Sequence, residues 1–158
     1  MSTNVAIKKI LVPVDGSKPS ERAAEYAVDI AAKRGATIVT VHVMHLPAYA
    51  FTPSPIEGMP TPAMAPIPLT VSSEERKIVE SYLHKVKEMA RKAGVTAEAK
   101  IIEDQPSIVH AITETAQKEA CDLIVIGTKG RTGIRKILLG SVASGVVTYS
   151  SCPVLVVR

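Results

Sequence analysis

The chain has 158 residues, which fits one domain, and 46% of them are apolar against 22% charged. This composition excludes a wholly disordered chain, and the aromatic content of 3% predicts an aliphatic core. No apolar run approaches the roughly 20 residues that span a bilayer, and the first residues do not resemble a secretory signal. We therefore expect a cytoplasmic protein with no membrane partner. Two cysteines, Cys121 and Cys152, are too few for a disulfide scaffold and are expected as reduced thiols.

The net charge of +4 comes from 19 basic and 15 acidic residues, which is a mild excess. A nucleic-acid-binding protein usually has a larger excess and stacking aromatics, so no nucleic-acid partner is expected. Most basic residues alternate with acids. One cluster without an acid contains Lys129, Arg131, Arg135 and Lys136. This cluster favours a local phosphate site.

Strand and helix patterns alternate in the first part of the chain. Residues 9–14 form a short apolar run, predicted as a strand with Pro13 near its end. Asp15-Gly-Ser17 is a turn, and a helix with one apolar face is predicted from about residue 19 to 34, before Gly35. The β-branched run 37–44 is predicted as the second strand.

Residues 47–70 differ from the rest of the chain, because they hold seven of the 11 prolines and one charge, Glu57. We interpret them as a long loop with extended, polyproline-like pieces. A surface insertion is one reading. A flap or a docking segment for a protein partner is the other, since Tyr49, Phe51, Met59 and Met64 are apolar for an exposed loop.

The alternation continues after this loop. Ser72-x-x-Glu75 is a capping box, and the helix that follows has an apolar stripe of Ile78, Val79, Tyr82, Leu83, Val86, Met89 and Ala90. Residues 95–102 alternate apolar and polar, which is typical of an edge strand. Further elements are a helix from Pro106, a fully apolar strand at 123–126, a helix at about 141–149 and a last strand at 153–157.

Such alternation predicts a three-layer α/β/α sandwich with a five-stranded parallel sheet. The two fully apolar strands, 9–14 and 123–126, suit the centre, and the alternating strand 95–102 suits an edge. The strand order 3-2-1-4-5 satisfies both conditions. The winding then reverses between the first and fourth strands, and ligands bind at the carboxyl ends of strands at such a point.

A glycine-rich loop follows the fourth strand at this point. We expect its glycines at 127, 130, 133 and 140 to adopt positive φ and to let the backbone approach a ligand. Gly140-Ser141 opens a helix whose first N–H groups attract phosphate. Ser141 either caps that helix or contacts the phosphate. The loop has neither the P-loop pattern nor the dinucleotide fingerprint.

These residues resemble the universal stress proteins, in their ATP-binding branch. That branch is marked by Gly, two residues, Gly, nine residues, Gly and Ser or Thr, matched here by Gly127, Gly130, Gly140 and Ser141. The resemblance also covers residues 10–17, 41–43, 122–127 and 153–157. It implies a Rossmann-like, adenine nucleotide alpha hydrolase-like fold in one domain over residues 1–158.

The resemblance also implies a nucleotide site. Asp15 would lie near the ribose or a phosphate-bound metal, and the backbone of Val43 would contact adenine. The expected binding residues are Pro13, Val14, Asp15, Val43, Ile126, Gly127, Thr128, Lys129, Gly130, Arg131, Gly140, Ser141, Val142 and Ala143. ATP is the expected ligand, with AMP, ADP and cAMP open, and Mg²⁺ would arrive with the triphosphate. No protein metal site is expected, since His42 and His45 fall on opposite faces of a strand.

No strong catalytic constellation is present, so we name no catalytic residue. The first hypothesis is a nucleotide-binding regulatory module in a stress response. The alternative is a slow ATPase or nucleotide-dependent phosphotransfer protein. An aspartyl-phosphate receiver shares the strand alternation, but it needs an acidic cluster after the first strand, where Asp15 stands alone.

The last strand, 153–157, is apolar and would be a sheet edge, which is an aggregation hazard unless it is paired. Pairing across a two-fold axis removes the edge, and the resemblance implies the same arrangement. We expect a homodimer whose last strands lie antiparallel.

Overall fold

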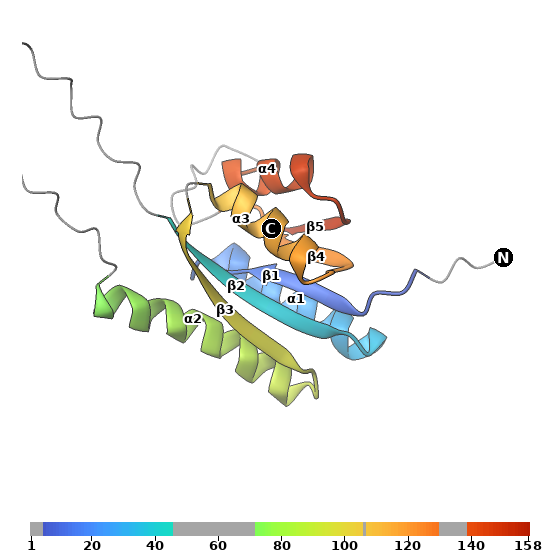
Figure 1. Ribbon diagram of the computed structural model, residues 1–158. Coiled ribbons are helices and arrows are strands. Elements are labelled where there is room, and N and C mark those ends of the chain that lie inside the picture. The colour runs from blue at the N-terminus through green and yellow to red at the C-terminus, as the bar shows by residue number, and fades with distance from the viewer. Residues whose placement is uncertain (1–4, 46–71, 106, 130–138) are drawn as a thin grey trace, which may run out of the picture.

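A computed structural model of the chain describes residues 5–45, 72–105, 107–129 and 139–158. Five parallel strands form one sheet in the order β3-β2-β1-β4-β5 (Figure 1). The strands are β1 (Lys9–Pro13), β2 (Thr37–His45), β3 (Ala97–Gln105), β4 (Leu123–Gly127) and β5 (Val154–Val157). The helices are α1 (Lys18–Arg34), α2 (Ser73–Lys92), α3 (Ile108–Lys118) and α4 (Ser141–Tyr149). The predicted fold class and strand order are confirmed.

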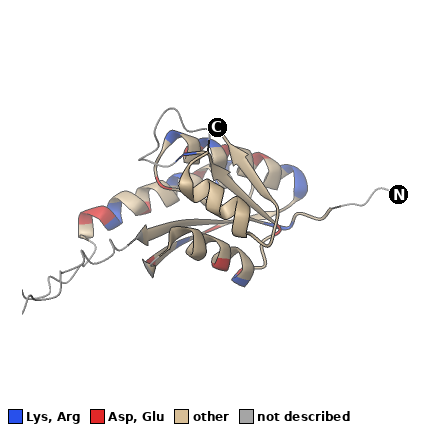
Figure 2. Cartoon of the chain, turned by 90° about the horizontal axis from the view of Figure 1, so that it is seen from above, with Lys and Arg blue, Asp and Glu red and all other residues tan. Residues whose placement is uncertain are grey.

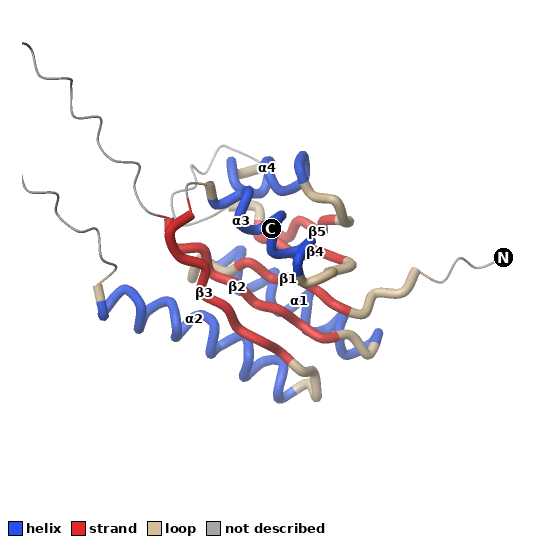
Figure 3. The backbone as a smooth tube through the Cα atoms, viewed as in Figure 1, coloured by secondary structure: helices blue, strands red, loops and turns tan. Residues whose placement is uncertain are grey.

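The helices divide between the two faces of the sheet, with α1 and α2 on one face and α3 and α4 on the other (Figure 3). Successive strand side chains point to opposite faces. Ile10 and Val12 therefore pack with α1 and α2, and Leu11 packs with α3 and α4. All three are fully buried, as expected for a central strand in a parallel sheet.

Local signals at the helix starts agree with this arrangement. Ser17, Ser72 and Ser107 cap α1, α2 and α3, and each side chain accepts a hydrogen bond from a backbone N–H three residues on. The predicted capping box of Ser72 and Glu75 is complete. The third helix begins at Ile108 rather than at Pro106, because Ser107 supplies the cap and Pro106 lies outside the described residues.

The edge strand β3 starts and ends later than the predicted 95–102. It runs beside β2 past a register shift between Val43 and His45, and His45 pairs with Gln105. Because β2 continues to His45, β3 gains three residues at its carboxyl end. The predicted segment 47–70 lies outside the described residues.

Of the charged residues that the structure describes, most lie on the helices rather than on the strands (Figure 2). Among the described residues, no helix is both long enough and apolar enough to cross a bilayer.

The prediction that Ile78 belongs to the buried stripe of α2 is wrong. Ile78 is 49% exposed, whereas Leu83 is 4% exposed within the cluster on the α1 side of the sheet. The buried residues of α2 lie along one face of the helix. Val79 lies on that face, and Ile78 does not.

Replacing Leu83 or Ile78 with alanine should change the free energy of unfolding by different amounts. We expect Leu83→Ala to lower the free energy of unfolding by about 2–5 kcal/mol, because it leaves a cavity in the core. Ile78→Ala, the matched surface control, should change it by less than about 0.5 kcal/mol. Urea unfolding followed by circular dichroism measures both, and equal losses would contradict the assigned faces.

The two cysteines are not bonded to each other in the structure. Cys121 is buried in the cluster on the α3 side, and Cys152 packs against the same cluster. Burial raises the pKa of the Cys121 thiol to about 11, because the thiolate loses its hydration.

Thiol labelling should therefore be selective. At about pH 8, iodoacetamide should modify the half-buried Cys152 well before Cys121 in the folded protein, because only thiolates react. Because the folded state holds the Cys121 proton more tightly than the unfolded chain does, the free energy of unfolding should fall as the pH rises from 9.0 towards about 11. Peptide mass spectrometry reads the labelling, and faster modification of Cys121 would contradict its burial.

Candidate functional site

A cavity of about 370 Å³ opens at the carboxyl ends of β1, β2 and β4. Its volume lies within the range of small-molecule sites. This is the point where the order of the strands reverses, as predicted. The lining residues are Pro13, Val14, Asp15, Ser20, Val41, His42, Val43, Ile108, Ile112, Ile126, Gly127, Thr128, Lys129, Gly140, Ser141, Val142 and Ala143.

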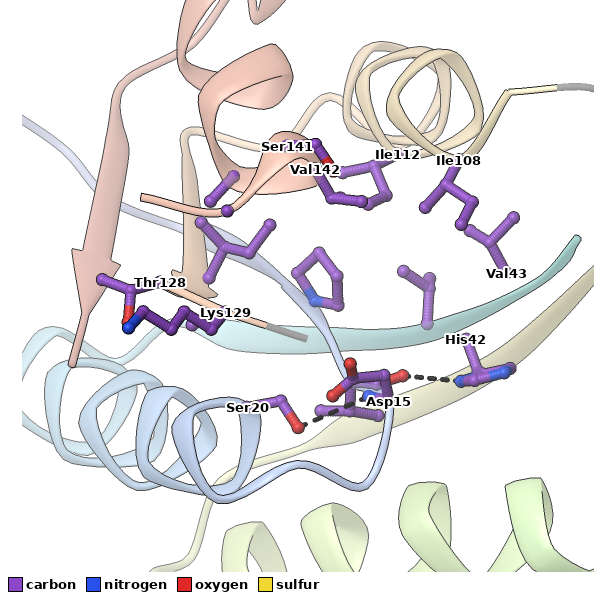
Figure 4. Close-up of a pocket in the computed structure, with 17 residues that line it drawn as sticks. Asp15, Ser20, His42, Val43, Ile108, Ile112, Thr128, Lys129, Ser141 and Val142 are labelled. Carbon is purple, nitrogen blue, oxygen red and sulfur yellow. Dashed lines mark hydrogen bonds between the residues drawn. The ribbon is translucent and has the colours of Figure 1, made fainter. Parts of the chain in front are cut away.

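The cavity has two ends of different character. Val43 of β2 and Ile108 and Ile112 of α3 gather at one end, while Thr128 and Lys129 lie at the other (Figure 4). The first end offers apolar side chains to a flat or hydrophobic group. The second offers a hydroxyl and a cationic ammonium, so the cavity suits a ligand with an apolar part and an anionic part.

The loop after β1 is held by hydrogen bonds within itself. Asp15 Oδ1 accepts from Ser17 N at 3.0 Å, and Asp15 N donates to Ser20 Oγ at 3.4 Å. Ser20 is buried, and its hydroxyl also donates to Ser17 O at 2.9 Å. These contacts place the Asp15 carboxylate at the cavity as part of a formed turn.

The loop after β4 is tied at both ends. Gly140 N donates to Thr128 O at 2.6 Å, so the chain returns beside the residue where it left the strand. Ser17 Oγ donates to Lys129 O at 3.3 Å, which joins this loop to the loop after β1. The two loops therefore form one connected rim.

Helix α4 starts at the cavity, and its start excludes one of the two roles considered for Ser141, that of the helix cap. Gly140 is the N-cap with φ −70° and ψ 162°, and no side chain makes a cap hydrogen bond. Ser141 is exposed and is the first helical residue, so it does not fill the capping role. No side chain of the N-cap residue therefore accepts a hydrogen bond from the first-turn N–H groups of α4. These groups and the positive end of the helix dipole face the cavity.

The glycines at the ends of this loop serve packing, and the predicted positive φ is wrong for both. In the described ranges, the glycines with positive φ are Gly16, Gly35 and Gly94. A Cβ on Gly127 would lie 2.7 Å from the backbone carbon of Pro19, and one on Gly140 would lie 2.9 Å from Thr128 O. Both glycines allow close backbone contacts within the protein rather than a special backbone conformation.

Most of the predicted site residues line the cavity. Twelve do so: Pro13, Val14, Asp15, Val43, Ile126, Gly127, Thr128, Lys129, Gly140, Ser141, Val142 and Ala143. Gly130 and Arg131 lie outside the described residues, as do Gly133, Arg135 and Lys136.

Five lining residues were not predicted, namely Ser20, Val41, His42, Ile108 and Ile112. Ile108 and Ile112 have the helical spacing of ordinary core residues, so no local signal separates them from the core. Val41 and His42 adjoin Val43, and their position at the end of a strand next to the predicted crevice is the signal that could have included them.

In the described part of the chain, no group of three or more His, Cys, Asp or Glu residues is arranged to hold a metal ion. His42 makes a structural contact, since its Nδ1 lies 2.7 Å from Val14 O. The side chain of His45 lies outside what the structure describes.

A model of the universal stress protein family matches residues 6–158. The chain belongs to the universal stress protein family. A family member from Methanocaldococcus jannaschii is 38% identical over 151 residues, covering 96% of this chain and 82% of that protein. Another from Bacillus subtilis is 35% identical over 153 residues, covering 95% of this chain and 98% of that protein.

Solved structures of the family have the same fold. A universal stress protein in complex with cAMP matches with a TM-score of 0.67 and 25% identity, covering 97% of this chain and 98% of that one. A universal stress protein from Archaeoglobus fulgidus matches with a TM-score of 0.69 and 24% identity, covering 96% and 93%.

Proposed function

We propose that this protein binds an adenine nucleotide in the cavity at the ends of β1, β2 and β4, and that ATP is its ligand. The observation that carries the proposal is the cavity itself, with an apolar end at Val43 and Ile108 and the start of α4 with Lys129 at the polar end. The match to a universal stress protein in complex with cAMP supports the class of ligand.

The polar end suits phosphates for three reasons. The first-turn N–H groups of α4 and its dipole attract anions. The Ser141 hydroxyl is exposed beside them, and Lys129 adds positive charge. Mg²⁺ would be carried by the phosphates, with Asp15 as the carboxylate that faces it.

We propose a regulatory role rather than rapid turnover. Asp15 is the sole carboxylate among the described residues that line the cavity, and its Oδ1 already accepts a hydrogen bond from the backbone. Catalysis of phosphoryl transfer depends on positioning and charge, so a slow ATPase is the second candidate, with Asp15 as the residue that would orient water.

Calorimetric titration with ATP, AMP and cAMP tests the proposal. We expect ATP to bind at one site per chain, and Ser141→Ala to weaken binding by about 1–2 kcal/mol if its hydroxyl contacts phosphate. Ser144→Ala is the matched control, because Ser144 lies on the same helix and is exposed. It should bind like the natural protein.

The outcomes separate the candidates. No heat with any of the three nucleotides would refute nucleotide binding. Stoichiometric retention of labelled ATP without turnover supports the regulatory module. A sustained release of phosphate that disappears in Asp15→Ala would instead support the slow ATPase.

We also propose a homodimer formed through the edge of β5. This strand is at one end of the sheet order, and Val154, Leu155 and Val156 are half-buried in the single chain. An exposed apolar edge favours pairing with a second copy across a two-fold axis.

A proline in β5 should disrupt such a dimer. Ile124 N donates to Pro153 O and Thr128 N to Val157 O, so odd-numbered residues of β5 pair with β4, and the N–H of Val156 points to the outer edge. Val156→Pro should therefore halve the mass measured by light scattering while circular dichroism stays unchanged. A natural protein that is monomeric at micromolar concentration would refute the dimer.

A further inference from the structure

The hydrogen-bond ladder between β1 and β2 ends where the cavity begins. The last residue pair in its register is Pro13 with Val41, and Val14 N still donates to Val41 O at 2.9 Å. In a regular parallel ladder, the next hydrogen bond would run from Val43 N to Val14 O. Here Val14 O is instead paired with the His42 side chain, whose Nδ1 lies at 2.7 Å. An imidazole thus takes the place of a backbone donor at the point where the sheet opens.

The same face of β2 makes an equivalent contact one step earlier. Thr40 Oγ1 donates to Val12 O at 3.1 Å, and Thr40 is fully buried. Thr40 does not line the cavity, whereas His42 does. Thr40 therefore binds a carbonyl of β1 inside the sheet, and His42 binds the next carbonyl that faces β2, which lies at the cavity.

The chemistry of this contact fixes the form of the imidazole. A carbonyl oxygen only accepts hydrogen bonds, so Nδ1 must carry the proton that bonds to Val14 O. The neutral ring is then the Nδ1–H tautomer, and Nε2 has the free lone pair. Figure 4 shows the His42 ring joined in this way to the strand end beside Asp15.

Tyr82 of α2 packs against the same loop. Its ring lies 6.3 Å from the His42 ring, centroid to centroid, at an interplanar angle of 55°. It also packs on Gly16, where a Cβ would lie 2.2 Å from Tyr82 Cζ, and Gly16 has φ +78°. His42 and Tyr82 therefore both contact the turn that contains Asp15, at Val14 and at Gly16.

We propose that His42 is a positioning residue for the nucleotide site. Its Nδ1–H holds the carbonyl of Val14, which precedes Asp15, and so sets the place of the Asp15 carboxylate and leaves the edge of β2 at Val43 open to the cavity. This inference rests on the proposed nucleotide binding, and it assigns His42 no contact with the ligand.

Two substitutions at His42 test the donor itself. In His42→Asn, the side-chain amide nitrogen falls where Nδ1 lies in histidine, so a donor to Val14 O is retained. In His42→Leu, a side chain of similar bulk carries no donor. Titration with ATP should give Asn within about threefold of the natural affinity and Leu weaker by about tenfold or more.

Thr40→Val is the matched control, because it removes the equivalent side-chain hydrogen bond within the sheet and keeps the shape of the residue. Its ATP affinity should stay within about twofold of the natural value. Equal ATP affinity of the natural protein and His42→Leu would overturn the inference. So would a loss in Thr40→Val as large as that in His42→Leu, since the effect would then be general loosening of the sheet.

A second measurement needs no ligand. Long-range ¹H–¹⁵N spectra at about pH 8, where an ordinary imidazole is neutral, should show His42 as the Nδ1–H tautomer. An Nε2–H tautomer would overturn the inference even if His42→Leu does not fold. Failure of ATP, AMP and cAMP to bind the natural protein would refute the proposed function alone, and this spectrum would still decide the His42–Val14 contact.

Discussion

The cavity depends on one constraint of the fold, which is that β1 and β4 lead into helices on opposite faces of the same sheet. After β1 the chain enters α1 on one face of the sheet, and after β4 it passes through the glycine-rich loop into α4 on the other face. Two adjacent strands whose continuations separate in this way leave a gap at their carboxyl ends. The position of the site follows from the topology, before any side chain is considered.

Close backbone contacts fix the positions of the segments on either side of that gap. Gly127 brings β4 against the backbone of Pro19 and Ser20 at the start of α1, and Gly140 brings the start of α4 against Thr128 O. A larger residue at either position would push these segments apart. The glycines at 127 and 140 are therefore explained by contacts inside the protein, and these contacts place the start of α4 at the cavity.

Polar contacts then connect the two loops and the end of β2. Ser17 joins the first loop to Lys129 O, and His42 joins the end of β1 to β2. Each bond is modest by itself. Together they limit the freedom of the turn around Asp15, which lowers the entropy lost when a ligand is bound.

Twelve of the residues that line the cavity were expected from the resemblance to the universal stress proteins. The amino-acid sequence by itself determined the element order, the class of fold and the strand order. It could do so because periodicity, serine caps and glycine spacing are local patterns, and because buried and alternating strands separate centre from edge. Only the tertiary structure decided that Gly140 rather than Ser141 caps α4, that Ile78 faces solvent, and that Ile108, Ile112 and His42 reach the cavity. These outcomes depend on which distant segment lies opposite each residue, and no pattern within a short stretch of chain contains that information.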